Sequence, residues 1–236
     1  MDFLKSLKFN SIDYIAPYDF HLHTAWTDGA NSTREMYDQA ILCGLEAILF
    51  SEHVRKTSAE WFGAFVDEIH SLPRSSCQAL VGMETKVEDY EGNIDCTSTM
   101  IAKSDLVIAS VHRFPGKKGD SPIEFDQITS EAAVEVEYRL AMAVLDNPAV
   151  HILGHPFGMC YSRYKINPPE NKIRALIKKA AEKEIAFEVN CRYHQNPWSL
   201  VKWCQEEGVN ISLGSDAHKI QEVGRIIRVL KGEEPA

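Results

Sequence analysis

The sequence predicts an α/β fold built on seven parallel strands, and three observations lead to this prediction. Short runs rich in β-branched residues alternate with segments of helical periodicity along the chain, which is the order of βαβ units. The strand segments are apolar without a regular polar alternation, as expected when helices cover the sheet. Histidines and acidic residues gather at the strand ends, where α/β barrels place their sites. We therefore expect right-handed crossovers between parallel strands.

The individual elements can be assigned in chain order. Strands are expected at 18–23, 47–53, 79–87, 106–112, 151–155, 186–190 and 210–215. Helices are expected at 32–44, 58–71, 97–103, 130–146, 169–183, 197–207 and 221–230. Ser32 and Glu35 form a capping-box sequence, Pro169 and Pro197 suit a first helical turn, and Gly208 suits a left-handed helix end. No linker or repeat interrupts the pattern, so we expect one domain over residues 1–236 and an active-site loop at 116–122.

Composition excludes several classes of protein. The chain has 236 residues and a formal net charge of −9, from 25 basic and 34 acidic residues. An acidic balance argues against sequence-independent binding of duplex DNA, which needs a basic face. No apolar run approaches the roughly 18 residues of a membrane span, and the N-terminal residues lack a signal-peptide pattern. The 6 cysteines include no CxxC pair, so we expect free thiols in a reducing, cytoplasmic compartment.

Most histidines fall at or just past the predicted end of a strand: His21, His23, His53, His112, His155 and His218. Glu84 and Asp216 occupy corresponding places on the third and seventh strands. Residues two apart on a strand point to the same side, so His21 and His23 can face one point, as can Asp216 and His218. These pairs meet only if the first and last strands are neighbours. A shared metal site therefore favours a closed barrel over an open doubly wound sheet.

The same parity predicts which residues lie beneath the candidate ligands and which histidines do not bind metal. His151 shares the parity of His155 but would lie about 13 Å lower, at ~3.3 Å per residue. His194 can be a general acid or an ordinary loop residue, and we expect the loop role; His70 is expected on an exposed helix surface. Small residues expected below the ligands, as hydrogen-bonding support, are Asp19, Ser51, Ser110, Ser212 and Gly214.

Together these residues resemble the PHP family, named after polymerase and histidinol phosphatase domains. The resemblance runs from Tyr18 to Arg228 and rests on motifs in matching order: HLHTAWTDGA (21–30), FSEH (50–53), GMET (82–85), ASVH (109–112), GHP (154–156) and SDAH (215–218). It implies a distorted (β/α)7 TIM-like barrel. It also implies two or three divalent metal ions, Zn, Mn or Fe, bound at the C-terminal ends of the strands.

The resemblance implies ligands for each metal ion. Glu84 would bridge two ions, and Glu84, Asp216 and His218 are expected to be the catalytic residues. The first ion would be held by His21, His23, Glu84 and Asp216, the second by Asp28, His53 and His218, and the third by Glu84, His112 and His155.

This donor set predicts a hydrolytic chemistry. Imidazole and carboxylate mixtures suit Zn, Mn or Fe. Water that bridges two such cations is deprotonated near neutral pH and becomes a nucleophile, while a further cation can neutralise phosphate oxygens. The resemblance and this chemistry predict a metal-dependent phosphomonoesterase, histidinol-phosphatase-like, that attacks a small phosphorylated metabolite with a metal-bridging hydroxide. No membrane partner is expected, and nucleic acid only as a nucleotide or short oligonucleotide.

Three arginines are candidates for binding the substrate phosphate at the barrel rim. Arg192 follows the sixth predicted strand, Arg113 directly follows His112, and Arg55 lies two residues past His53. A guanidinium can bind phosphate through two parallel hydrogen bonds, so each of these residues can act as a clamp.

Other functions remain open at this point. A 3′–5′ exonuclease or nucleotide phosphatase would use the same metals beside an aromatic and basic groove, for which Trp26, Tyr161, Arg163 and Tyr164 are candidates. A metal-dependent amidohydrolase also begins with H-x-H on its first strand. Members of that class commonly bridge their metals with lysine or use a lone terminal Asp, unlike Glu84 and the D-x-H pair here. A non-catalytic binding barrel would be favoured by a missing ligand, and none is missing.

Overall fold

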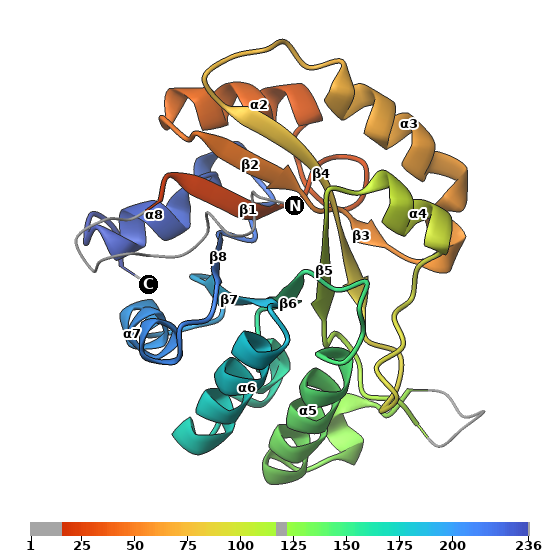
Figure 1. The fold of residues 1–236 in the computed structure, drawn as a ribbon, viewed down its shortest axis with the longest axis vertical. Helices are drawn as coiled ribbons and strands as arrows, with labels where there is room; N and C mark the ends of the chain where they lie inside the picture. The colour runs from red at the N-terminus through yellow and green to blue at the C-terminus, as the bar shows by residue number, and fades with distance from the viewer. Residues whose placement is uncertain (1–15, 117–121, 236) are drawn as a thin grey trace.

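The computed structural model describes residues 16–116 and 122–235. Two expectations concern residues outside these ranges, namely the N-terminal residues without a signal-peptide pattern and most of the loop at 116–122. Figure 1 shows a curved sheet whose outer side is covered by helices. None of the helices in the described ranges is long and apolar enough to cross a membrane.

The strand pairs of the sheet are all parallel and follow the order β1-β2-β4-β5-β6-β7-β8, with β3 paired to β4. Where β1 reaches β8, the His23 amide donates to Ala217 O at 2.8 Å and the Ala217 amide donates to His21 O at 3.1 Å. The predicted parallel α/β barrel is therefore confirmed in a nearly closed form. The strands are β1 (Tyr18–Leu22), β2 (Ala47–Phe50), β3 (His53–Val54), β4 (Gln78–Lys86), β5 (Leu106–Ser110), β6 (Ile152–Gly154), β7 (Ala186–Asn190) and β8 (Ile211–Gly214).

Several predicted capping signals are observed, and Pro197 lies in the first turn of its helix as expected, but Pro169 is the N-cap residue that precedes its helix. The Glu35 amide donates to the Ser32 hydroxyl at 3.3 Å, and the Ser32 amide donates to the Glu35 carboxylate at 2.8 Å. Gly208 ends its helix with φ of 67°. The helices are α2 (Thr33–Leu42), α3 (Ala59–His70), α4 (Ser98–Lys103), α5 (Ser130–Val144), α6 (Glu170–Glu182), α7 (Pro197–Glu207) and α8 (Arg225–Leu230).

Three local features differ from the prediction. The strand expected at 47–53 is interrupted after β2, because Ser51 hydrogen-bonds through its hydroxyl to the Leu22 backbone. The helix expected at 221–230 begins only at Arg225, because Gly224 has φ of 70° and donates its amide to Asp19 at 2.8 Å. A π-helical turn at Cys160–Tyr164 was not expected, and it depends on a carboxylate from another helix, described below.

The interior below the strand ends is filled by apolar side chains. On β4, β5 and β7 these side chains share their strand face with Glu84, Ser110 and Glu188. The apolar cluster therefore forms a floor beneath a polar mouth. It comprises Phe20, Ala47, Leu49, Leu80, Leu106, Ile108, Ile152 and Ala186.

Strand β1 departs from regular alternation at Phe20 and His21. Between Asp19 and Leu22 the register advances by three residues on β1 but by two on β2, which is the signature of a β-bulge. Phe20 packs into the apolar floor, and His21 hydrogen-bonds to Glu188 at the polar mouth. Two consecutive side chains thus point inward, which a regular strand cannot achieve.

Candidate functional site

The structure brings all of the predicted metal ligands together at the C-terminal mouth of the barrel. Their donor atoms form overlapping groups, and within each group the atoms lie within 4.8 Å of one another. Because the groups share members, the donors make one continuous cluster. The groups are His23, Asp28, His53 and His218; His21, Glu84 and His155; His21, His23 and Asp216; and His53, Glu84 and His112.

Glu84 lies at the centre of the cluster. Its Oε1 atom is 2.8 Å from His155 Nε2 and 3.0 Å from His112 Nε2. Its Oε2 atom is 2.7 Å from His53 Nδ1, and His21 Nε2 lies 3.5 Å from Oε1. Strand β4 therefore presents one fully buried carboxylate to imidazoles from β1, β3 and the ends of β5 and β6. This position suits the bridging role that the resemblance implies.

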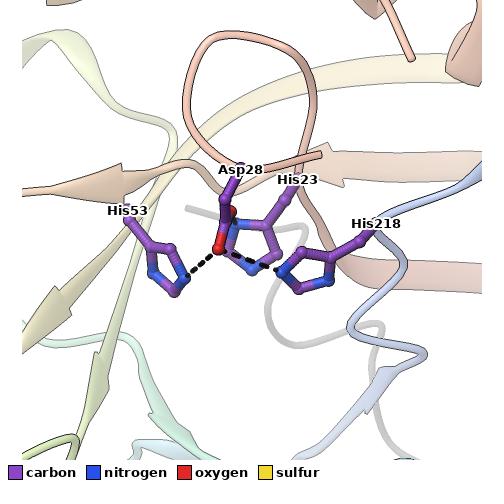
Figure 2. A group of neighbouring side chains, drawn as sticks. All are labelled: His23, Asp28, His53 and His218. Carbon is purple, nitrogen blue, oxygen red and sulfur yellow. Dashed lines mark ion pairs between the residues drawn. The ribbon is translucent and has the colours of Figure 1, made fainter. Parts of the chain in front are cut away.

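Asp28 gathers a second set of imidazoles (Figure 2). Its Oδ2 atom lies 3.4 Å from His53 Nε2 and 3.5 Å from His218 Nε2. Its Oδ1 atom is 4.0 Å from His23 Nδ1, so His23 joins the set that was expected to contain only Asp28, His53 and His218. The Asp28 side chain is 53% exposed and forms the solvent edge of the cluster.

The loop that carries Asp28 is shaped by the buried carboxylate of Glu52. The Thr24 amide and hydroxyl donate to Glu52 Oε1 at 2.8 and 2.6 Å, and the Thr27 hydroxyl donates to Oε2. Gly29 completes the turn, because a Cβ atom there would lie 2.4 Å from His23 O. Burial raises the pKa of Glu52 to about 7, although its hydrogen bonds to Thr24 and Thr27 lower it. The motif residue Glu52 thus positions Asp28.

Asp216 and His155 reach the cluster through unusual backbone conformations. Their φ values are 52° and 22°, in the left-handed region that non-glycine residues rarely adopt. Asp216 Oδ1 lies 3.2 Å from His23 Nε2 and 3.9 Å from His21 Nε2. Such conformations cost about 1–3 kcal/mol each and persist where the surroundings enforce them. Here they turn two side chains inward directly after their strands end.

Opposite charges are concentrated in this buried cluster. Burial alone would raise the pKa of Glu84, but the charges of His112 and His21 bring it well below its usual value. Burial alone would lower the pKa of His53, but hydrogen bonds with Asp28 and Glu84 raise it to about 10. A proton on His53 therefore balances part of the carboxylate charge, whereas burial lowers the pKa of His23 to about 4. A cation that binds here would displace such a proton.

The donor atoms fit divalent transition metals. The cluster offers imidazole nitrogens and carboxylate oxygens without a thiolate, a set that suits Zn, Mn or Fe. His21 Nε2 and His23 Nε2 are buried and make no hydrogen bond with the described residues. Carboxylate oxygens nevertheless lie 3.5 and 3.2 Å from them, as expected for ligands that share a cation.

Glu188 is the functional residue that sequence reasoning missed. Its Oε1 atom accepts hydrogen bonds from His21 Nδ1 and Asn190 Nδ2, each at 2.8 Å, and its Oε2 atom accepts from the His155 amide. Gly214 makes room for it, because a Cβ atom there would lie 2.0 Å from Glu188 Oε1. Glu188 shares its strand face with Asn190, and that inward parity was the only available signal.

The prediction that small polar residues below the ligands hydrogen-bond to them is mostly wrong. The β1 bulge removes Asp19 from beneath His21, and its carboxylate instead accepts the Ser215 and Gly224 amides at 2.9 and 2.8 Å. Ser51 binds the β1 backbone. The hydroxyls of Ser110 and Ser212 make no hydrogen bond with the described residues.

The three candidate arginines lie in different environments. Arg192 donates to Asp216 O at 3.0 Å and lines the cavity over the cluster. Arg55 also lines this cavity, but Arg113 is exposed and is not among the described lining residues. Arg163, considered above only for a nuclease groove, does line it. Two of the three predicted arginines, Arg55 and Arg192, therefore line the cavity.

The remaining candidates lie away from the cavity. His194 is buried, with Nδ1 accepting the Asn190 amide and Nε2 donating to Pro156 O, each at 3.0 Å, so it braces the loop after β6. His70 is exposed at the end of α3, and His151 Nδ1 accepts the Val107 amide at 3.1 Å. Trp26 stacks on Trp61.

The aromatic residues considered for a nuclease groove do not assemble beside the site. Trp26 donates its indole N–H to Glu68 at 2.8 Å, Tyr164 stacks on Phe114, and Tyr161 lines a separate cavity. Only Arg163 of that set lines the cavity over the cluster among the described residues. The four residues proposed for that groove therefore do not lie together beside the cluster.

Comparisons with known proteins agree with this arrangement. The family model described as the PHP domain matches residues 19–192. A probable phosphatase of Clostridium novyi is 30% identical over 222 residues, which cover 89% of this chain and 82% of that protein. The DNA polymerase/3′–5′ exonuclease PolX of Bacillus subtilis is 28% identical over 86% of this chain but only 34% of its own length.

A solved structure shares the fold. The histidinol phosphate phosphatase of Lactococcus lactis, determined with zinc, L-histidinol and phosphate, superposes with a TM-score of 0.65 at 21% identity. The match covers 93% of this chain and 94% of that one. The motif order, the nearly closed parallel barrel and the family match lead to one conclusion: the chain belongs to the PHP domain family.

Proposed function

We propose that the protein is a metal-dependent phosphatase that hydrolyses phosphate monoesters of small molecules. The observation that carries this proposal is the position of Glu84, whose two oxygens lie within 3.0 Å of His53, His112 and His155. A single carboxylate among so many imidazoles suits adjacent cations that share a ligand. The similarity to probable phosphatases supports the same reaction.

The proposed site holds two or three divalent ions, Zn, Mn or Fe, on the ligands assigned above. When bound, these ions would supply hydroxide from water at neutral pH and neutralise phosphate oxygens. The chain's own residues do the positioning. Arg192, anchored on Asp216 O at 3.0 Å, points a guanidinium toward the cavity for the scissile phosphate. Glu188 holds His21 and the His155 backbone in place.

The contacts of Glu84, Asp216 and His218 support the catalytic roles proposed for these residues. Asp216 and Glu84 supply carboxylates to neighbouring metal positions, and His218 donates its Nδ1 proton to Asp216 O at 2.9 Å. That bond leaves His218 Nε2 free to face the Asp28 side. A cytoplasmic location stays a prediction, supported by cysteines that are all free thiols.

The test is release of inorganic phosphate from a panel of esters by protein reconstituted with Zn, Mn or Fe. The panel contains histidinol phosphate, mononucleotides, a short oligonucleotide and phenyl phosphate. We expect monoester hydrolysis and a loss of at least about 100-fold in kcat/KM for His53→Ala. His70→Ala, an exposed histidine on α3, is the matched control. No release from any monoester, or full activity in His53→Ala, would contradict the proposal.

A further inference from the structure

The cavity over the metal cluster is lined by positive charge outside the candidate ligands. It has a volume of about 310 Å³, enough for a small molecule. Apart from those ligands, its described lining consists of Arg55, Arg163, Arg192, Met159, Ser162 and Tyr193. These residues bring three guanidinium groups and no carboxylate. The part of a substrate beyond its scissile phosphate therefore faces cations.

Arg55 is a half-buried cation whose guanidinium donates to Val54 O at 2.8 Å and makes one long ion pair with the described residues. Its nearest carboxylate outside the ligand cluster is Asp95, with Arg55 Nε 4.0 Å from Oδ2. That carboxylate is already engaged by Lys86 Nζ at 3.0 Å and by the Lys56 amide at 3.1 Å. The Arg55 backbone is fixed, because its amide donates to the Ser58 hydroxyl at 3.0 Å. A partly desolvated guanidinium on a rigid backbone favours an anionic partner.

Another guanidinium adds positive charge on the same side of the barrel mouth. Arg113 is a further, exposed guanidinium, and it follows β5. The two arginines follow β3 and β5, which both pair with β4. An anion bound on this side of the mouth would therefore meet positive charge from two elements.

Arg55 and Arg192 lie on different sides of the barrel mouth. Arg55 follows β3, which pairs with β4, whereas Arg192 follows β7, and β5 and β6 lie between β4 and β7 in the sheet. In a nearly closed sheet this separation places the two residues across the candidate metal cluster from each other. A phosphate held beside Arg192 leaves Arg55 available for another group.

We propose that the substrate is a phosphate monoester with a second anionic group, a carboxylate or another phosphate, and that Arg55 binds this group. The inference rests on the phosphatase function proposed above and narrows its substrate class. An ester that carries an ammonium group, as histidinol phosphate does, would bring positive charge against Arg55, Arg163 and Arg192.

The experiment uses aryl phosphates that differ only at the para position. They are phenyl phosphate, 4-carboxyphenyl phosphate, 1,4-phenylene bisphosphate and 4-(aminomethyl)phenyl phosphate, assayed with the metal-loaded protein. For each protein, kcat/KM is expressed relative to phenyl phosphate. Comparing these ratios between variants cancels the intrinsic reactivity of each leaving group. The carboxylate and bisphosphate arms show which anion is preferred.

We expect Arg55→Gln to lower the ratio for the preferred anionic ester about tenfold or more, the value of a charge-assisted hydrogen bond. Arg55→Glu should lower it further and raise the ratio for the aminomethyl ester. Arg74→Gln is the matched control, since Arg74 is exposed in the turn before β4, at the opposite end of the strands. Melting curves check that each variant is folded.

Binding of the corresponding phosphonates, which cannot be hydrolysed, provides a readout independent of turnover. Tighter calorimetric binding of the anionic phosphonates, lost in Arg55→Gln, supports the assignment even if no ester is hydrolysed; the phosphatase function would then be wrong and the anion site right. Equal affinities for all phosphonates, or ratios that Arg55→Gln leaves unchanged, would overturn the inference.

Discussion

His21 Nδ1 lies 2.8 Å from Glu188 Oε1, and both side chains are fully buried. Burial alone would raise the pKa of Glu188, but His21 lowers it, so the carboxylate is ionised and His21 Nδ1 carries the proton. The bond orients Nε2 of the same ring toward Glu84. A carboxylate–histidine pair of this kind fixes a metal ligand's tautomer and raises its basicity.

The first prediction concerns this pair. Glu188→Gln keeps the size of the side chain but replaces the anion, so metal affinity should fall about 10–100-fold. Competition with a chelator measures this change, and circular dichroism verifies the fold. Glu182→Gln, on the exposed surface of α6, is the control. An unchanged affinity in Glu188→Gln would show that the pair does not support metal binding.

The second prediction concerns Gly214, whose missing side chain leaves space for the pair. In Gly214→Ala the new Cβ atom would lie 2.0 Å from Glu188 Oε1 and 2.9 Å from His21 Cβ. We expect a loss of about 1–3 kcal/mol in the free energy of unfolding, the usual cost of overpacking, together with weaker metal binding. Urea denaturation and metal titration measure the two effects.

Two comparisons separate overpacking from a general intolerance of alanine. Gly63→Ala on α3 should be neutral or slightly stabilising, because its nearest neighbour would be the flexible Lys103 Nζ at 3.4 Å. Gly214→Ala should also cost less in a Glu188→Ala background, where the clashing carboxylate is gone. Equal costs in both backgrounds would refute the steric explanation.

The third prediction concerns Glu137 on α5, which holds the π-helical turn beside the cavity. Its buried carboxylate accepts the Met159 and Cys160 amides at 3.0 and 2.9 Å. Burial raises the pKa of Glu137 from 4.5 to about 7, although these hydrogen bonds lower it. Between those two pH values the unfolded chain ionises while the folded protein keeps its proton, so stability falls as pH rises.

Glu137→Gln should remove this part of the pH dependence. The difference in unfolding free energy between wild type and variant should change by up to about 3 kcal/mol from pH 4.5 to pH 7, then level off. Urea denaturation across this range tests it, with exposed Glu131→Gln on the same helix as the control. A difference that stays constant with pH would disprove the assignment.

The fold and the candidate metal cluster were largely readable from the sequence. Alternating strand and helix patterns gave the parallel sheet, because covered strands must be apolar and crossovers need helices between them. The strand-end positions of His53, His112 and His155 placed these residues at one mouth, where the structure brings them onto Glu84. Local pattern sufficed here because parallel strands end on the same side of the sheet.

The residues that hydrogen-bond to the candidate ligands could not be predicted from the sequence in the same way. Regular strand alternation predicts Asp19 beneath His21. The β1 bulge breaks this alternation because it inserts an extra inward residue. No local pattern marks such a bulge in this sequence. The break after β2 likewise depends on Ser51 binding the neighbouring strand, which is a contact between distant segments.

The sequence alone thus determined the family of fold, the mouth of the barrel and the identity of the clustered imidazoles and carboxylates. Only the tertiary structure decided that Glu188 reaches His21 across 167 positions of the chain, and that Arg55 and Arg192 lie apart. The physical reason is that periodicity is a local property, which indicates the face of a helix or strand on which a residue lies. Register, bulges and barrel closure depend on contacts between distant segments, and they set the distances between those faces.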